Sequence, residues 1–331
     1  MKAILVSIPG GADQLTMATT DEPIPKSDEL LVRVGATALN RADLLQREGL
    51  YPPPAGASSI LGLEMSGIVD MVGGECRRFK PGDRVFALLP GGGYAEYCVV
   101  PEAMAMLIPE RISLEEAAAI PEAYFTAYQA LVWLGKIEPG ERVLVHAGAS
   151  GVGMAAIQLA RQVGATVFAT AGTDGKCEAC VDAGAAGAHN YRDGPFDRPF
   201  REAMGGHGCD LIIDVVGAPY WEQNAGLLAP DGRWVVLAMM GGTTIEQIDL
   251  MRLFIKRTQV IFSNLRYRSE RYKVALTREF EERILPLFAK RRLAPKIDRV
   301  FPLTEIGEAH RYLEANRNIG KVVVRISRPK T

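Results

Sequence analysis

Short apolar runs and helical stretches alternate between about residue 122 and residue 265. The helical stretches include GMAAIQLARQVG and WEQNAGLLAPDG. Short continuous apolar strands are buried on both faces, so the pattern predicts a parallel sheet covered by helices. The five runs that we expect to form its strands are RVLVHAG (142–148), TVFATAG (166–172), CDLIIDVVG (209–217), RWVVLAMMG (233–241) and QVIFSN (259–264).

Residues 1 to about 120 have a different pattern, with strands and turns divided by glycine and proline, as in ELLVRVGATALN and DRVFALLPGGGYAEYCVV. This indicates a β-rich domain. After residue 265 comes a long helical stretch, RYKVALTREFEERILPLFAK, then a strand, a helix and the last strand GKVVVRI. Because this tail lacks glycine-rich turns at its strand ends, we expect it to return to the first domain.

The composition narrows the class of protein. A chain of 331 residues exceeds one typical core, which favours two domains. Its 38 basic and 39 acidic side chains are balanced, which argues against nucleic acid or a membrane surface as the main partner. The first apolar run ends at Pro9, before a signal-peptide core can form, and no apolar segment is long enough to span a membrane. We therefore expect a cytoplasmic protein.

The five cysteines do not form a disulfide or zinc pattern. Cys177 and Cys180 make a lone C-x-x-C on an expected helix, where packing is the more common role; a redox role stays open. We expect no metal site.

The segment HAGASGVG, residues 146–153, joins the first apolar run to a helical stretch. In a dinucleotide-binding G-x-G-x-x-G turn, the second glycine lets the pyrophosphate approach and the third lets the helix pack on the strand. Gly148 and Gly153 hold the first and third places, and Ser150 holds the second. Its hydroxyl can donate to a phosphate, and Gly151 keeps the backbone free. The turn therefore predicts a dinucleotide site.

A serine exposed on a sharp turn between a strand and a helix is also the nucleophile of hydrolases, which require G-x-S-x-G. Here the last glycine is replaced by Val152, and one of only four histidines, His310, lies in the helical tail. This makes a hydrolase a poor interpretation.

The end of the second strand predicts which dinucleotide binds. An NAD site has an acidic residue there for the ribose 2′-hydroxyl. This strand ends in FATAGTDGK, where Gly172 and Thr173 are uncharged and Lys176 can pair with a 2′-phosphate. We expect NADPH. The alternative is that Thr173 only caps the next helix and Lys176 is solvated.

These motifs together resemble the medium-chain dehydrogenase/reductase superfamily, and within it the zeta-crystallin-like quinone oxidoreductases, in particular those of animals that a tumour suppressor induces. The resemblance covers essentially the whole chain. The motifs that carry it are ALNRADLLQREGLYPPP, ILGLEMSGIV, PGDRVFALLPGGGYAEY, AAAIPEAYFTAYQAL, VLVHAGASGVGMAAIQLAR, TAGTDGK and NRNIGKVVV.

The resemblance implies an α/β fold: a Rossmann doubly wound parallel sheet plus a β-rich, chaperonin-like (GroES-like) catalytic domain. It assigns residues 1–122 and 266–331 to the catalytic domain and 123–265 to the NADP-binding domain. In zinc-dependent members, two cysteines and a histidine hold a catalytic metal, and the corresponding places here are Asn40, Leu63 and Glu122. That set cannot make a tetrahedral zinc site.

The resemblance also implies the cofactor contacts. Tyr191 is among them, although it is otherwise interpretable as a surface aromatic. The full set is Asn40, Arg41, Asp43, Tyr51, Thr126, Gln129, Ser150, Gly151, Val152, Gly172, Thr173, Lys176, Tyr191, Val216, Gly217, Met239, Met240, Gly241, Ser263, Asn264, Leu265 and Asn318.

Without metal, the expected reaction is hydride transfer from NADPH to a quinone, which needs little activation. We expect no essential acid/base pair. Tyr51 is the candidate donor to the developing oxyanion, or a packing aromatic in its turn. Asn40 and Ser150 are the other candidate catalytic residues, and Asn40 would orient the nicotinamide carboxamide or the substrate oxygen.

Two rival functions stay open: an NADPH-dependent alkenal or enone reductase, and an NADPH-binding structural or RNA-binding protein with little turnover. The family implies a homodimer or tetramer joined through sheet edges. QVIFSN is either that edge or a strand buried within one sheet.

Overall fold

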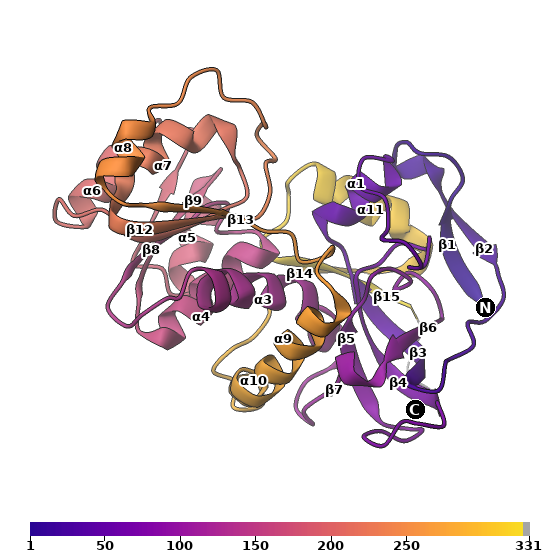
Figure 1. The fold of residues 1–331 in the computed structure, drawn as a ribbon. Helices are drawn as coiled ribbons and strands as arrows, with labels where there is room; N and C mark the ends of the chain where they lie inside the picture. Colours follow the sequence, from indigo (N-terminus) through magenta and orange to yellow (C-terminus); the bar gives the residue numbers. More distant parts are fainter. Residues whose placement is uncertain (327–331) are drawn as a thin grey trace. The chain divides into compact units, whose positions relative to one another are not determined.

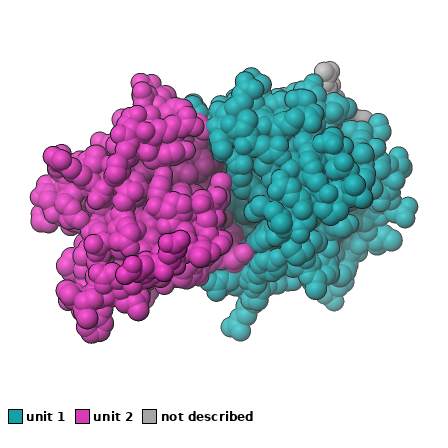
Figure 2. All heavy atoms as spheres, turned by 90° about the horizontal axis from the view of Figure 1, so that it is seen from above, with its two compact units in different colours: residues 1–125, 266–331 teal, residues 126–265 magenta. Residues whose placement is uncertain are grey.

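The computed structural model describes residues 1–326. The chain forms two compact units: unit 1 contains residues 1–125 and the part of 266–331 that is described, and unit 2 contains residues 126–265. Figure 2 shows the two units in different colours. The last five residues of the expected catalytic domain, 327–331, lie outside the described residues.

Unit 2 is a six-stranded parallel sheet with the strand order β10-β9-β8-β11-β12-β13. The chain reverses direction across the sheet between β8 and β11, as in doubly wound folds. The strands are β8 (Arg142–Val145), β9 (Thr166–Ala171), β10 (Gly187–Asn190), β11 (Cys209–Asp214), β12 (Leu228–Val236) and β13 (Gln259–Phe262).

Helices cover both faces of this sheet. In Figure 1, α4 lies on one side of it, and α7 and α8 lie on the other. The fully buried Trp234 on β12 belongs to one apolar cluster with Ile212 on the neighbouring β11 and Leu144 on β8. The helices of unit 2 are α4 (Gly151–Val163), α5 (Asp174–Asp182), α6 (Asp197–Ala203), α7 (Trp221–Leu227) and α8 (Leu250–Ile255).

Unit 1 is built on a largely antiparallel sheet with the order β14-β15-β3-β4-β5-β7, and β6 also pairs with β3. A separate hairpin joins β1 (Lys2–Val6) and β2 (Leu15–Thr19). The strands of the larger sheet are β3 (Glu29–Ala38), β4 (Glu64–Val72), β5 (Arg84–Leu88), β6 (Tyr97–Pro101), β7 (Ala105–Leu107), β14 (Ile297–Pro302) and β15 (Lys321–Arg325).

The C-terminal segment completes unit 1. Strand β15 lies between β14 and β3, and it pairs antiparallel with β3 through Val323 and Ala38. The helices that accompany this sheet are α1 (Arg41–Arg47), α2 (Leu114–Ala118), α9 (Glu270–Arg283), α10 (Leu285–Ala289) and α11 (Ile306–Glu314). Helix α3 (Pro121–Tyr128) and a π-helical segment, Gln129–Leu134, carry the chain from unit 1 into unit 2.

The α/β fold class is confirmed, but several expected elements were wrong. The first 120 residues contain two short helices, α1 and α2, whose capping boxes begin at Asn40 and Ser113. The expected helical stretch 271–290 is two helices, α9 and α10, because Pro286, in the first turn of α10, has no N–H to continue α9. The fourth of the expected strands, β12, begins at Leu228 and ends at Val236, before the expected methionines.

Candidate cofactor and acceptor sites

The glycine turn of unit 2 joins β8 to α4. Ser150 is the N-cap of α4, and its Oγ accepts a hydrogen bond from the Gly153 N–H at 3.0 Å. The serine oxygen therefore caps the helix while its O–H can still donate to a ligand. The N–H groups of Gly151 and Val152 are first-turn donors, which an α-helix does not pair internally. This end of α4 is thus suited to an anion.

The first and third glycines of the motif are sterically restricted. A Cβ at Gly153 would lie 2.4 Å from the Ala147 oxygen, and one at Gly148 would lie 2.8 Å from the Cys180 Sγ. Only glycine allows this close approach of α4 and the turn. Cys180 is fully buried behind the turn, and burial raises its pKa to about 12, which favours the packing role expected for it.

Residues expected to recognise the adenosine ribose lie at the end of β9. Thr173 caps α5 by accepting from the Lys176 N–H at 3.3 Å, so the capping role left open by the sequence is real. A Cβ at Gly172 would lie 2.5 Å from the Tyr191 hydroxyl, so the tyrosine lies directly beside this glycine. The nearest acidic residue, Asp174, accepts a hydrogen bond from Asn190 at 2.9 Å.

Two further loops of unit 2 carry expected contacts. Val216 and Gly217 follow β11, and Met239, Met240 and Gly241 follow β12. The loops are joined by backbone bonds, including Met240 N–H to Val215 oxygen at 3.1 Å. Both methionines are exposed. All these positions are at the carboxyl ends of the parallel strands, where open α/β sheets bind ligands.

The start of unit 2 and the segment after β13 meet at Gln129. Its Nε2 donates to the Ser263 Oγ at 3.2 Å, whereas its buried Oε1 has no hydrogen-bond partner among the described residues. An unpaired buried acceptor is costly, and a ligand with an N–H or O–H group would satisfy it. Thr126 is half-buried, Asn264 is exposed and Leu265 is buried.

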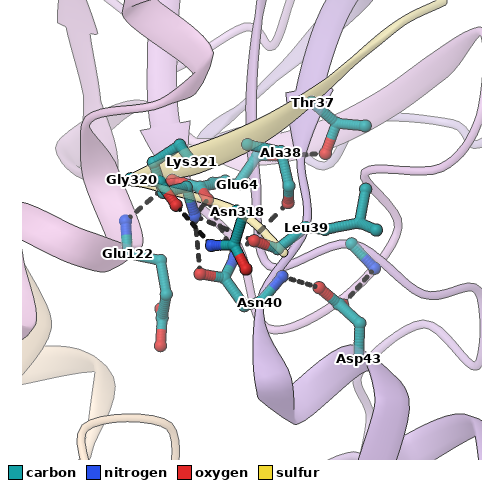
Figure 3. A network of polar contacts seen from close by, with 11 residues as sticks. Thr37, Ala38, Leu39, Asn40, Asp43, Glu64, Glu122, Asn318, Gly320 and Lys321 are labelled. Atoms are coloured by element: carbon teal, nitrogen blue, oxygen red, sulfur yellow. Dashed lines mark hydrogen bonds and ion pairs between the residues drawn. The ribbon is translucent and has the colours of Figure 1, made fainter. Parts of the chain in front are cut away.

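In unit 1, Asn40 lies in a buried polar network (Figure 3). The Lys321 ammonium donates to the Glu64 Oε1 at 2.6 Å and to the Asn40 Oδ1 at 2.7 Å, and the Asn40 Nδ2 donates to the same Glu64 oxygen at 2.8 Å. The Asp43 carboxylate accepts from the backbone N–H groups of Asn40 and Gly62. The network therefore fixes the Asn40 amide, and it completely buries Asp43.

Glu122 lies beside this network without joining it through its side chain. Its backbone N–H donates to the Glu64 Oε2 at 2.9 Å, and its side chain extends away from the group (Figure 3). Burial, and then the charge of Glu64, raise the pKa of Glu122 to about 7. Burial likewise raises the pKa of Asp43 to about 6.

The places of the zinc ligands do not suit zinc. Leu63 has no donor atom, and the Lys321 ammonium already occupies the space between the Asn40 and Glu64 oxygens. Across residues 1–326, no group of three or more His, Cys, Asp and Glu side chains is arranged to hold a metal ion.

Tyr51 is held by Arg266. The guanidinium carbon lies 5.1 Å from the centre of the Tyr51 ring, and Nη1 donates to the Tyr51 carbonyl at 3.3 Å. The ring of Tyr267 meets it edge-on at 5.4 Å. Of the other expected contacts, Arg41 donates to the Leu313 carbonyl at 2.8 Å, and Asn318 is buried and donates to the Gly320 carbonyl at 2.7 Å.

Sequence reasoning missed Glu64, Lys321 and Arg266 as members of these sites. Glu64 begins a strand and Lys321 begins another, and 257 positions separate them in the chain. A lone charge at the start of an apolar strand was the available signal, because a buried charge needs a partner. No local pattern identified that partner.

Comparisons with known proteins agree with this architecture. Residues 26–110 match the family model "Alcohol dehydrogenase GroES-like domain", and residues 151–282 match "Zinc-binding dehydrogenase". A quinone oxidoreductase of Pongo abelii is 32% identical over 94% of this chain and 93% of its own length. The chain therefore belongs to the medium-chain dehydrogenase/reductase superfamily, whose members are oxidoreductases that bind NAD or NADP.

Solved structures of the same fold differ in their named activities. An NAD-dependent alcohol dehydrogenase superposes with a TM-score of 0.88 at 32% identity, covering 99% of this chain and 100% of its own. The CurK enoyl reductase has a TM-score of 0.87 at 29% identity, covering 98% of this chain and 99% of its own. No helix within residues 1–326 is long and apolar enough to cross a membrane.

Proposed function

We propose that the protein is a zinc-independent, NADPH-dependent quinone reductase. The observation that carries the cofactor assignment is the uncharged end of β9. Gly172 and Thr173 stand where an NAD site has an acidic residue, and Asp174 is engaged by Asn190. Lys176, in the first turn of α5, is the cation placed for a 2′-phosphate.

The residues of unit 2 fit such a cofactor. The capped N-terminus of α4 offers N–H groups to the pyrophosphate, and the unpaired Gln129 Oε1 accepts an N–H donor. When bound, NADPH supplies a hydride. The chain's part is to orient the cofactor and the acceptor and to exclude water.

In unit 1 we assign the acceptor contact to Tyr51, whose hydroxyl donates to the oxygen that gains charge. Arg266 fixes the tyrosine from its ring face and its carbonyl. A quinone needs only such a donor, because the added charge delocalises onto an oxygen that is readily protonated. Asn40 has a positioning role, since Glu64 and Lys321 hold its amide.

Enone reduction is the second candidate. It requires a proton at carbon, and Glu122, with its pKa near 7, keeps a proton at neutral pH better than an ordinary carboxyl does. The likeness to an enoyl reductase structure supports the same candidate.

NADPH oxidation with 9,10-phenanthrenequinone, a simple 1,4-quinone and an enal separates these functions. We expect turnover of the quinones, and a fall in kcat/KM of about tenfold or more in Tyr51→Phe, through loss of one donor to the oxyanion. Tyr97→Phe, on β6, is the matched control and should leave kcat/KM unchanged. A larger rate with the enal would favour the second candidate. Tight NADPH binding without turnover of any acceptor would contradict both and support a binding protein.

The cofactor assignment has its own controls. Ser150→Val removes the cap and the phosphate donor, so it should weaken NADPH binding. Lys176→Ala should raise the KM for NADPH much more than that for NADH. Equal rates with NADH and NADPH in the wild-type protein would refute the role of Lys176.

We propose further that the protein is a homodimer joined through β13. This strand lies at an edge of the six-stranded sheet of unit 2, which supports its role as the edge that joins two copies. Phe262 on β13 and Phe254 on α8 are exposed, by 59% and 76%. An exposed apolar edge strand is a surface that pairs readily with a second chain.

A further inference from the structure

A chain of buried polar side chains crosses unit 2 beneath the expected cofactor loops. His146 Nδ1 lies 2.9 Å from the Thr170 Oγ1, and His146 Nε2 lies 2.7 Å from the Asn224 Oδ1. The Asn224 Nδ2 donates to the Asp214 Oδ2 at 3.3 Å. All four side chains are at most 1% exposed.

The direction of each hydrogen bond follows from the end at Asp214. Its carboxylate can only accept, so the Asn224 NH₂ group faces it and the Asn224 oxygen faces His146. His146 must then carry its hydrogen on Nε2, which leaves Nδ1 to accept from the Thr170 hydroxyl. Burial lowers the pKa of His146, which favours this neutral ring.

The hydrogen-bond chain ends at the backbone of one expected cofactor loop. Asp214 Oδ1 accepts from the N–H groups of Val216 at 2.6 Å and Gly217 at 3.1 Å. Its other oxygen also accepts from the Trp234 indole at 3.1 Å. The carboxylate therefore fixes the loop after β11 and links it to the sheet.

The other end of the hydrogen-bond chain contacts two more expected cofactor loops, those after β8 and β9. Thr170 lies two residues before Gly172 on β9, and its carbonyl accepts from the Gly148 N–H at 2.8 Å. His146 directly follows β8 and lies two residues before Gly148. The rings of Phe196 and Tyr220 pack on His146 at 4.9 and 4.7 Å, so the imidazole cannot turn freely.

We propose that His146, Thr170, Asn224 and Asp214 form a one-directional hydrogen-bond chain that positions the three loops after β8, β9 and β11 for the cofactor, with His146 as a positioning residue in its Nε2–H form. This inference rests on the proposed binding of NADPH. The hydrogen-bond direction itself is independent of that proposal.

The first experiment therefore uses the protein without cofactor. Nitrogen-15 NMR of the four histidines, with His146 assigned through its loss in His146→Gln, should show a neutral ring protonated on Nε2 at pH 7.5. In Asp214→Asn the backbone N–H groups of Val216 and Gly217 keep the new amide oxygen at the Oδ1 position, so its NH₂ group faces Asn224 and the Trp234 indole. The Asn224 amide must then turn its oxygen toward this NH₂ group, and the His146 hydrogen should move to Nδ1. A His146 ring that is charged at pH 7.5, or a hydrogen on Nδ1 in the wild-type protein, overturns the hydrogen-bond chain.

The second experiment measures the Kd for NADPH by fluorescence titration. Thr170→Val keeps the shape but removes the donor to His146, so the Kd should rise about tenfold. Thr170→Ser, which restores a hydroxyl, should stay within about twofold of the wild-type protein. Thr277→Val removes another buried hydroxyl, which in unit 1 donates to the Lys273 carbonyl, and should leave the Kd unchanged.

The outcomes separate the two proposals. If wild-type protein does not bind NADPH, the proposed cofactor is wrong while the NMR result still tests the chain. If the wild-type protein binds NADPH and Thr170→Val binds it as tightly, the positioning role is wrong. An equal loss in Thr170→Val and Thr277→Val would also contradict it, since that pattern indicates general destabilisation.

Discussion

Three carboxyl groups of unit 1 differ in the donors that surround them. The Glu64 oxygens accept from the Lys321 ammonium, the Asn40 amide and the Glu122 N–H. The Asp43 oxygens accept from two backbone N–H groups. Glu122 has no such donor among the described residues, and burial next to Glu64 raises its pKa to about 7. Glu122 therefore keeps its proton to a higher pH than an ordinary glutamate does.

Stability should depend on pH through this residue. The pKa of Glu122 is higher in the folded protein than in the unfolded chain. Its protonation therefore stabilises the folded state fully below about pH 4.5, and this stabilisation is lost as the pH rises through about 7. The Glu122→Gln variant has no ionisable group at this position, so it does not lose this stabilisation. The melting temperature of the variant minus that of the wild-type protein should therefore be larger at pH 8 than at pH 5, by about 2 °C or more. Thermal melts at both pH values measure this.

Glu110→Gln, which removes an exposed carboxylate of the same unit, is the control and should show no such difference. A melting-temperature difference for Glu122→Gln that is the same at both pH values would show that Glu122 titrates normally.

At this scale the sequence predicted the close packing of the turn at Gly153, because that packing depends on neighbours a few positions away. The cap that Ser150 provides for its helix was not predicted, and its contact with a phosphate remains a prediction. The His146 chain was not predictable in the same way. Its four members come from the turn after β8 and from β9, β11 and α7, and an isolated polar residue beside or within an apolar strand does not indicate its partner.

At the scale of elements, helix α4 depends on the absence of a side chain at Gly153. A Cβ there would lie 2.4 and 2.5 Å from two backbone oxygens, and backbone cannot move aside cheaply. We expect Gly153→Ala to destabilise the protein by about 2 kcal/mol or more. Urea unfolding measures the change.

Gly175, in the first turn of α5, is the matched position. A Cβ there meets nothing within 4 Å, so Gly175→Ala should be neutral or stabilising by up to about 1 kcal/mol, through the higher helix propensity of alanine. Equal effects of the two substitutions would show that the close packing of α4 on the turn is not a constraint.

The errors in predicted elements have physical causes. Strand β12 begins at Leu228 although Pro230 and Gly232 follow, because a shift in register against β11 accommodates the irregular stretch. Strand β10, GAHN, was missed because it contains little apolar surface and lies at a sheet edge. Apolar runs predict central strands better than edge strands.

At the scale of the whole molecule, the exposed edge at β13 is the feature that bears on assembly. Phe262→Lys places a charge on this edge and should convert the proposed dimer to a monomer in sedimentation experiments. Val181→Lys, at an exposed position of α5, should leave the assembly unchanged. A Phe262→Lys protein that sediments as the wild type would show that copies join elsewhere.

The lack of glycine-rich strand ends in the C-terminal segment predicted that this segment returns to unit 1. The ion pair that this return gives to Glu64 was not predictable. The distance along the chain between Glu64 and Lys321 conceals a contact that only the finished sheet creates. The roles of the two units, catalytic and cofactor-binding, remain predictions.

The position of β15 between β14 and β3 sets an order of events during synthesis. All of unit 2 leaves the ribosome before the last strand of unit 1 has been made, so unit 2 can fold while unit 1 still lacks a strand. Until Lys321 emerges, Glu64 lacks the counter-ion that its buried position requires. We therefore expect nascent chains stalled before this residue to keep unit 1 protease-sensitive while unit 2 is already resistant.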